Sequence, residues 1–381
     1  MKPDLREQQT RFAMLLQERG PRITEIAREL GVYPETARYW FNHNVLGHRG
    51  VAYQAVPNYE GLGFKRILAV IDFANEYLPQ ARYILEGMTN ICYLTNHFRI
   101  FPDGYYFLIL TVPSEVESNY RKLLTDLQDA GIFRVLQLDR LDWVNVMPMK
   151  AKYFDFSEGK WDFDWSAIVN ERGRPPPAIT PNGSIKYDYE DLLILAKLQV
   201  NATKSIREIA HILKMPYERA IYHWGHITER GQISLYSIRW PATGPKDQEA
   251  QRAWQQQHAH MALDFLVRNS TESERRELMA SVERLPFAWV NGGSEERRGN
   301  FFSELVVPLE YYSETFHYLS EALLDSRGRI QFMIGDQANA LAYTIPTHLY
   351  DEEAQAWTND PDGTLAKFKK LVLTIKGEER R

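Results

Sequence analysis

The strongest constraint in this sequence is that one segment occurs twice. An ungapped alignment of Ile23–His43 with Ile206–His226 gives identical residues at nine of 21 positions. The identical pairs are Ile23 and Ile206, Glu25 and Glu208, Ile26 and Ile209, Ala27 and Ala210, Leu30 and Leu213, Glu35 and Glu218, Ala37 and Ala220, Tyr39 and Tyr222, and His43 and His226. Self-similarity of this kind is typical of a chain built by duplication of one structural unit. The sequence therefore predicts an internal duplication.

Each copy has the pattern of a helix-turn-helix. In the first copy the apolar residues of ITEIAREL fall on one stripe of a helix, and Gly31 follows as a left-handed cap. Pro34 then suits the first turn of a second helix. The predicted inward residues of the second helices are Ala37, Phe41 and Asn44 in the first copy and Ala220, Trp224 and Ile227 in the second. After each unit, HRGVAYQAV or RGQISLYSIRW places a basic residue and a glycine before an alternating strand, which predicts a wing.

The outer faces of these second helices, together with the wings, carry the candidate DNA contacts. Arg, Asn, His and Thr side chains on such a face donate hydrogen bonds to base edges and phosphates in a major groove. The candidates are Thr36, Arg38, Tyr39, Asn42, His43 and Arg49 in the first copy and Arg219, Tyr222, His223, His226 and Arg230 in the second. Ile221 stands where the first copy has Arg38, so the second copy is expected to read DNA less well.

A second repeated pattern follows each helix-turn-helix. The first half reads as strand Leu68–Phe73, helix Tyr77–Glu86, strands ICYLTN and YYFLILTVP, helix Val116–Ala130 and strand Phe133–Leu138. The second half repeats this order with MALDFLV, helix Glu272–Arg284, FAWVN, FFSELVVP, helix Ser313–Leu324 and RIQFMI. A βαββαβ order predicts an antiparallel sheet with both helices on one face. The predicted fold class is α+β, with two winged helix-turn-helix domains and two ferredoxin-like modules in tandem.

These patterns divide the chain into six segments. The predicted segments are a winged helix-turn-helix over 1–60, an α+β module over 61–154, a Pro-rich linker over 155–186, a second winged helix-turn-helix over 187–243, a second α+β module over 244–347, and a C-terminal tail over 348–381. RGRPPPAITPNGS in the linker cannot continue a helix or a central strand. We expect Trp161, Phe163 and Trp165 to pin the linker onto one of the modules, because WDFDW is too aromatic for free linker.

Composition limits the class of protein. Apolar residues make up 44% and charged residues 25%, which is globular usage. The single cysteine, Cys92, excludes an internal disulfide framework and a cysteine-rich zinc site, and it favours a cytoplasmic location. No apolar run reaches the roughly 18 residues that a membrane span needs, so no membrane partner is expected. The net charge is −5, yet both helix-turn-helix segments carry a small positive excess, which has the right sign for binding phosphate.

The order of helix-turn-helix, wing and βαββαβ resembles the Lrp/AsnC family of feast/famine regulators in a duplicated form. The resemblance is carried by ITEIAREL, ETARYW and VPNYEGLGFKRILAVIDF in the first half and by DLLILAKLQVNATKSIREIAHIL with ERGQISLY in the second. It implies DNA binding by the recognition helices, dimerisation through paired α+β modules, and an amino-acid effector held between those modules. The family's Gly-x-x-Asp pattern is not cleanly present. Asp103 is the one candidate effector contact, and Asp103-Gly104 is also a simple hairpin turn.

The sequence thus predicts a sequence-specific DNA-binding transcription regulator. Its expected partners are double-stranded DNA, a small effector such as an amino acid, and either a second copy or the other half of an intramolecular pseudo-dimer. No enzyme, cofactor or metal site is predicted, because the sequence has no phosphate-cradling loop, HExxH, cysteine pair or nucleophile elbow. His223 with His226, and His258 with His260, have no carboxylate or cysteine in the motif to complete a metal site.

Two other functions remain open at this point. In one, the winged helices bind protein, and the chain is an effector-sensing or scaffold protein. In the other, the chain is an enzyme, since some relatives of this fold are tetrapyrrole decarboxylases that use His and Arg in their α+β modules. Their His-Asn-Tyr stretch at the second sheet strand is not matched here, although Asn96-His97-Phe98-Arg99 is loosely similar.

Overall fold

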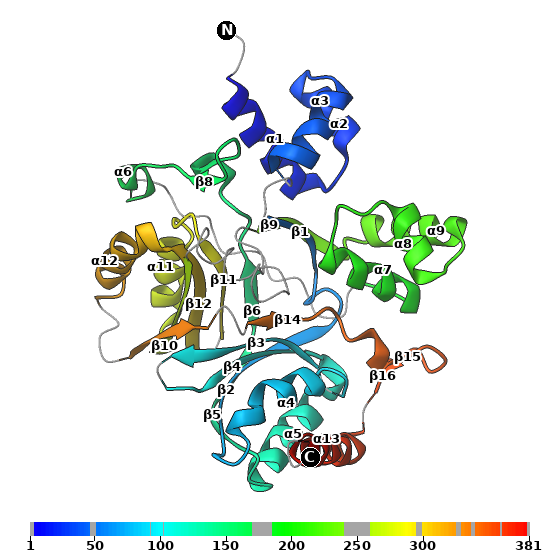
Figure 1. The fold of residues 1–381 in the computed structure, drawn as a ribbon, viewed down its shortest axis with the longest axis vertical. Coiled ribbons are helices and arrows are strands. Elements are labelled where there is room, and N and C mark those ends of the chain that lie inside the picture. Colours follow the sequence, from blue (N-terminus) through cyan, green and yellow to red (C-terminus); the bar gives the residue numbers. More distant parts are fainter. Residues whose placement is uncertain are drawn as a thin grey trace.

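The computed structural model confirms the α+β class, with two helix-turn-helix units and two βαββαβ modules (Figure 1). It describes residues 4–45, 51–91, 93–101, 103–169, 185–239, 260–294, 299–324, 329–336, 340–358 and 360–378. Within these ranges no helix is both long and apolar enough to cross a membrane.

The first helix-turn-helix contains an irregular turn that the sequence pattern did not indicate. It is built from α1 (Leu5–Arg19), α2 (Ile23–Leu30) and α3 (Pro34–Tyr39), and a π-helical turn continues α3 over Trp40–Val45. A π-helix has more residues per turn than an α-helix, so the residues that face inward after this turn differ from those that α-helical spacing predicts. Ala37 and Phe41 are buried as predicted, but Trp40 and Val45 complete the buried face in place of Asn44, which is half-buried.

The second helix-turn-helix comprises α7 (Tyr189–Val200), α8 (Ile206–Leu213) and α9 (Tyr217–Glu229). Ala220 and Ile227 are buried as predicted, whereas Trp224 is only half-buried. The prediction that His223 lies on the outer face is wrong. Its side chain is buried against α7, where the ring forms a hydrogen bond with the carboxylate of Asp191.

The two predicted wings pair with each other. β1 (Ala52–Pro57) and β9 (Ile233–Arg239) form an antiparallel two-stranded sheet, and the Tyr53 and Tyr236 rings stack across it at 5.7 Å. One strand from each half therefore joins the two helix-turn-helix units, which lie at the top and right of Figure 1.

Each module has the predicted ferredoxin-like order. The first contains β2 (Phe64–Phe73), α4 (Ala81–Met88), β3 (Leu94–Phe101), β4 (Tyr106–Pro113), α5 (Glu117–Asp129) and β5 (Phe133–Leu141). The second contains β10 (His260–Ser270), α11 (Glu272–Val282), β11 (Ala288–Gly293), β12 (Gly299–Pro308), α12 (Tyr312–Ala322) and β13 (Ile330–Gly335). The strand orders are β5-β2-β4-β3 and β13-β10-β12-β11, all antiparallel.

The pairing of β3 with β13 joins the two sheets into one ten-stranded sheet, and each half adds one further strand to the sheet of the other. After β5, the chain continues as β6 (Trp143–Val146), which pairs with β11 of the second module. After β13, which itself pairs with β3, the chain continues as β14 (Leu341–Ala342), which also pairs with β3. The faces turned away from the helices share one apolar core, made by residues of both modules: Leu68, Val70, Phe98, Ile100, Phe107, Leu141, Leu266, Phe302 and Met333.

A small hairpin follows each module and packs on the opposite one; we call these hairpins the clasps. The first clasp is β7 (Phe154–Asp155) with β8 (Lys160–Trp161), and the second is β15 (Tyr350–Asp351) with β16 (Ala356–Trp357). Trp161 contacts Phe287 of the second module at 5.5 Å, and Trp357 contacts Phe64 of the first at 5.2 Å.

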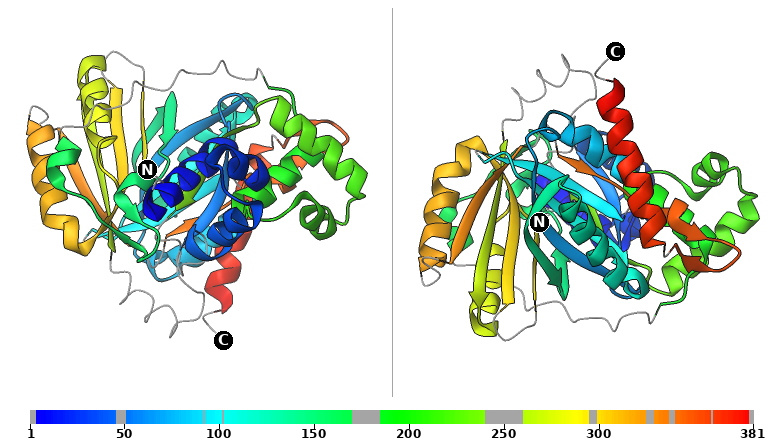
Figure 2. Two further views of the ribbon diagram at one scale, coloured as in Figure 1. Left: turned by 90° about the horizontal axis from the view of Figure 1, so that it is seen from above. Right: turned by 90° about the horizontal axis from the view of Figure 1, so that it is seen from below.

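The clasps occupy segments that the sequence predicted as linker and tail. Phe163 stacks on Tyr311, and Trp165 of α6 (Trp165–Val169) lies near Tyr318, so the aromatic residues pin this segment onto the second module, as expected. The proline run over 170–184 lies outside the described residues. In the tail, α13 (Pro361–Glu378) packs on α4 and α5, which Figure 2 shows from below.

Candidate functional site

Strand β3 brings a histidine and an arginine to the helix-covered face of the first module. Alternate residues of a strand point to opposite faces. Phe98 and Ile100 point into the apolar core between the sheets, so His97 and Arg99 point to the other side. Arg82, in the first turn of α4, and Tyr106, opposite Arg99 on β4, complete the group.

His97 is fully buried and pairs with a tyrosine from the other half of the chain. Its Nε2 lies 3.2 Å from the Tyr343 hydroxyl, which follows the exchanged strand β14. Its Nδ1 is also buried and has no hydrogen-bond partner among the described residues. Burial lowers the pKa of His97 to about 4, with a contribution from Arg82, and burial raises the pKa of Tyr343 to about 12. Both side chains are therefore neutral at neutral pH.

A pocket of about 440 Å³ opens at the two arginines of this group. It is lined by Asn75, Leu78, Pro79, Arg82, Arg99 and Tyr106. Arg82 donates a hydrogen bond to Glu86 at 2.8 Å, which holds its guanidinium at the start of α4. Two guanidinium groups at one pocket favour a ligand that carries carboxylates, because their donors match carboxylate oxygens in pairs. The group of His97, Arg82, Arg99, Tyr106 and Tyr343 is named the β3 site below.

The second module places different chemistry at the equivalent positions. His97 pairs with Leu108, which lies five residues before the proline that ends β4. In the second module the residue five positions before the proline that ends β12 is Ser303, and it pairs with Asn291. Asn291 is therefore the counterpart of His97. It donates a hydrogen bond to the sulfur of Met147 at 3.8 Å. Met147 follows the strand that the first half contributes, just as Tyr343, the partner of His97, follows the strand that the second half contributes. Gly293 stands where the first module has Arg99.

Two carboxyl groups lie side by side on the sheet of the second module, and Asp264 is the more deeply buried of the two. Asp264 and Glu304 are directly opposite each other on β10 and β12. Burial and the nearby Glu304 raise the pKa of Asp264, and burial raises the pKa of Glu304 to about 7, although Arg239 offsets part of this shift. Asp264 lies on the same face of its strand as Leu266, which belongs to the core shared by the two modules, whereas the β3 site is on the helix-covered face of the first module.

The predicted DNA contacts of the first copy are mostly on the surface. Arg38, Tyr39, Asn42 and His43 are exposed, and Thr36 is half-buried. Arg38 forms an ion pair with Glu35 at 3.5 Å, and the Tyr39 ring lies 4.7 Å from that of His43. Arg49 lies outside the described residues.

The second copy is less exposed. Arg219, Tyr222 and Arg230 are on the surface, His226 is half-buried and His223 is buried. Arg219 is paired with Glu190, and Arg230 donates to the backbone oxygen of Lys186. The candidate effector contact Asp103 is exposed in the β3–β4 hairpin, where Gly104 adopts a φ of 77°.

Comparison with known proteins gives a fold and no family. No protein-family model matches the chain, and no curated protein matches it. A crystal structure of the siroheme decarboxylase NirDL is similar, with a TM-score of 0.51, 14% identity, and coverage of 97% of this chain and 99% of that one. NirDL in complex with an iron-uroporphyrin III analogue gives a TM-score of 0.49 at 12% identity, over 96% and 99% of the two chains.

This similarity corrects one prediction. The sequence predicted that the chain is not an enzyme, and the match contradicts it, because nearly the whole chain has the fold of a decarboxylase. The sequence did not indicate Arg82, Tyr106 or Tyr343 as members of this group. The available signal was the stretch around His97, which was noted only as loosely similar to a decarboxylase motif.

Proposed function

We propose that this protein is a decarboxylase that acts on a carboxylate-bearing tetrapyrrole of the siroheme class. The observation that carries the proposal is the β3 site, where two arginines line a pocket and one of them, Arg82, is close enough to lower the pKa of the buried His97. The fold shared with NirDL supports the substrate class. Because the pocket is smaller than a whole tetrapyrrole, it fits one carboxylate-bearing edge of the ring.

Decarboxylation of an acetate side chain converts R–CH2–COO⁻ and one proton into R–CH3 and CO2. The C–C bond to the carboxylate breaks, its electron pair passes into the conjugated ring, and the side-chain carbon then takes up the proton. In the β3 site Arg82 and Arg99 would hold the substrate carboxylates. The His97–Tyr343 pair would deliver the proton, which requires the reacting side chain to extend from the arginines to within hydrogen-bond reach of this pair.

The test is anaerobic incubation of the purified protein with siroheme, followed by mass spectrometry of the tetrapyrrole. Loss of CO2 is expected. His97→Asn copies the residue of the second module and should reduce turnover by about 100-fold or more, the usual size of a general-acid contribution. Tyr343→Phe should also slow turnover. Met147→Leu, at the counterpart position in the second module, is the control and should leave turnover unchanged.

Two results would contradict the proposal. One is the absence of any change in the siroheme absorption spectrum on addition of protein, together with no loss of CO2. The other is equal turnover by the wild type and the folded His97→Asn variant, which would place the chemistry elsewhere.

DNA-binding regulation of the Lrp/AsnC type is a second candidate. It is favoured by the exposure of Arg38, Asn42 and His43 on the recognition helix of the first copy. Mobility shifts with genomic DNA should weaken steeply as salt is raised, and Arg38→Ala should weaken them further. The absence of a shift at low salt with all fragments would remove this candidate without bearing on the decarboxylase.

A further inference from the structure

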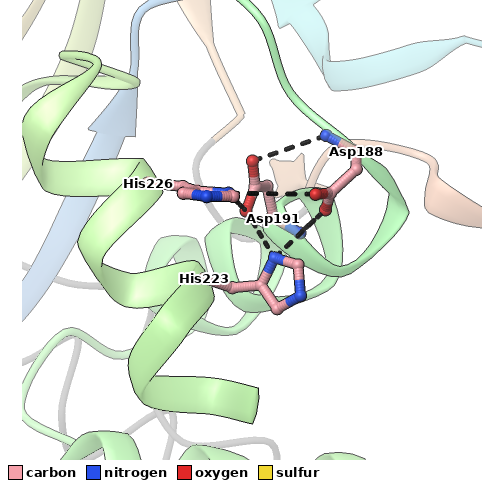
Figure 3. Close-up of side chains that lie close together, drawn as sticks. All are labelled: Asp188, Asp191, His223 and His226. Carbon is pink, nitrogen blue, oxygen red and sulfur yellow. Dashed lines mark hydrogen bonds and ion pairs between the residues drawn. The ribbon is translucent and has the colours of Figure 1, made fainter.

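Four side chains of the second helix-turn-helix converge on one point, on helices that contribute no residue to the β3 site (Figure 3). Two come from the start of α7 and two from the middle of α9. They are Asp188, Asp191, His223 and His226, and we call them the α7–α9 cluster. One ligand atom from each lies within 4.8 Å of the others. This arrangement supplies the carboxylates that the His223 and His226 pair lacks in the local sequence.

The spacing in sequence explains why the cluster forms. Asp188 and Asp191 are three residues apart at a helix start, and His223 and His226 are three residues apart on a helix. Residues three apart lie on the same helix face. Since α7 and α9 pack against each other, the acidic face of one meets the histidine face of the other.

The distances match the size of a metal centre. The Nδ1 atom of His223 lies 2.9 Å from an oxygen of Asp191 and 3.3 Å from one of Asp188. The Nδ1 atom of His226 lies 3.7 Å and 3.9 Å from oxygens of the same two residues. In a tetrahedral zinc site with metal–ligand distances of about 2.0–2.2 Å, neighbouring ligand atoms are about 3.3–3.5 Å apart.

Both carboxylates are held in place by further hydrogen bonds, through the Oδ1 atom of Asp188, which also lies near His223, and through the Oδ2 atom of Asp191. Asp188 accepts a hydrogen bond from the backbone of Asp191 at 3.0 Å, as the N-cap of α7. The Oδ2 atom of Asp191 accepts from Gln232 Nε2 at 2.8 Å, while its Oδ1 faces both histidines. Outer hydrogen bonds of this kind orient the ligands of protein-bound metals.

One atom in the cluster has no hydrogen bond. The Nδ1 of His226 is buried and has no hydrogen-bond partner among the described residues, although it points at the carboxylates. The Tyr222 ring packs on the His226 ring at 4.2 Å and fixes its orientation. A buried imidazole nitrogen is rarely left unsatisfied, and a bound cation is one way to satisfy it.

The first helix-turn-helix shows that the fold does not require this cluster. The alignment of the two copies places Trp40 where the second copy has His223. Trp40 packs edge-on against Phe12 of α1 at 5.9 Å, an apolar contact in the same place. Extended upstream, the same alignment places Leu5 and Gln8 opposite the two aspartates. The polar cluster is therefore specific to the second copy.

We propose that the α7–α9 cluster binds one divalent transition-metal ion, with zinc the best match to two imidazoles and two carboxylates. The ion would join α7 to α9 and thereby stabilise the second helix-turn-helix. This proposal is independent of the proposed function, because its ligands take no part in the β3 site.

The experiment uses the full chain, freed of metal with a chelator and titrated with zinc against a chromophoric competitor. One equivalent should bind, thermal unfolding should move to higher temperature, and cobalt should give the ligand-field absorption of a tetrahedral site. His223→Gln with His226→Gln should abolish all three effects. His211→Gln, an exposed histidine on α8, is the matched control and should bind zinc as the wild type does.

Two further variants separate a metal role from a structural one. Asp188→Asn keeps the N-cap, since asparagine caps as well as aspartate, but it removes a charged ligand and should weaken zinc binding. Gln232→Ala should weaken it by about 10–100-fold, as expected for loss of an outer hydrogen bond. Wild type that binds no zinc, or a folded double-histidine variant that binds zinc and cobalt unchanged, would overturn the proposal.

Discussion

At the scale of single residues, one position on the second strand of each module separates the two halves chemically. His97 in the first module and Asn291 in the second are both buried and both pair with a residue from the opposite half. Histidine can transfer a proton and asparagine cannot, so only the first module keeps a proton-transferring side chain at this position. The sequence indicated His97, but Tyr343 lies 246 residues away and no local pattern connects them.

The buried carboxyl pair makes stability depend on pH. Burial raises the pKa of Glu304 to about 7, so between its ordinary pKa and 7 the folded chain keeps a proton that the unfolded chain releases. Stability should therefore fall as pH rises through this window and level off above it. Glu304→Gln should flatten that fall, measured as Tm from about pH 5 to about pH 8.

His97 acts in the opposite direction, because its lowered pKa contributes stability that is lost as pH falls from about 6.5 towards 4. It is unchanged in the Glu304→Gln variant, so the difference between variant and wild type isolates the carboxyl pair. Parallel Tm curves for the two proteins would show that Glu304 is ionised in the fold.

For the helices and strands, local patterns predicted which type of element each segment forms, but not always which of its residues face the core. The βαββαβ order and the helix-turn-helix positions follow from alternation and helical spacing, and the structure has them. The π-helical turn after Tyr39 shifts the inward face to Trp40 and Val45, because α1 offers an aromatic surface there. The sequence predicted only a C-terminal tail here, because the surface on α4 and α5 that α13 packs against comes from a distant part of the chain.

Packing of α13 on the first module should depend on Phe368, which is fully buried. Phe368→Ala is expected to cost about 3–5 kcal/mol of stability by leaving a cavity. Limited proteolysis should then release the tail faster. Leu373→Ala, on the same helix but 69% exposed, should change stability by less than about 0.5 kcal/mol. Equal proteolysis rates for the two variants would mean that α13 is held by other contacts.

At the scale of the whole molecule, the two halves are linked by three exchanges: the wings, the strands β6 and β14, and the clasps. Duplication was visible in the sequence, but these exchanges were not. They rest on backbone pairings and aromatic contacts between residues more than a hundred positions apart, which leave no periodic signal.

The exchanges predict that the halves hold together without a peptide link between them. A protease site placed within 170–184 should allow complete cleavage while native mass spectrometry still shows one particle of full mass. The cut protein should also unfold in one cooperative transition, since each half contributes strands to the other's sheet. Separation of the fragments after cleavage would show that the linker, and not the exchanged strands, keeps the halves together.

The pairing of His97 with Tyr343 joins a residue of one half to a residue of the other. In a dimer of identical subunits every mutation appears in both sites, so neither site can change without its twin. Covalent fusion removes that constraint, and a single codon can then alter one site only. The fused chain can therefore carry a histidine at one of two equivalent positions and an asparagine at the other, as it does at His97 and Asn291.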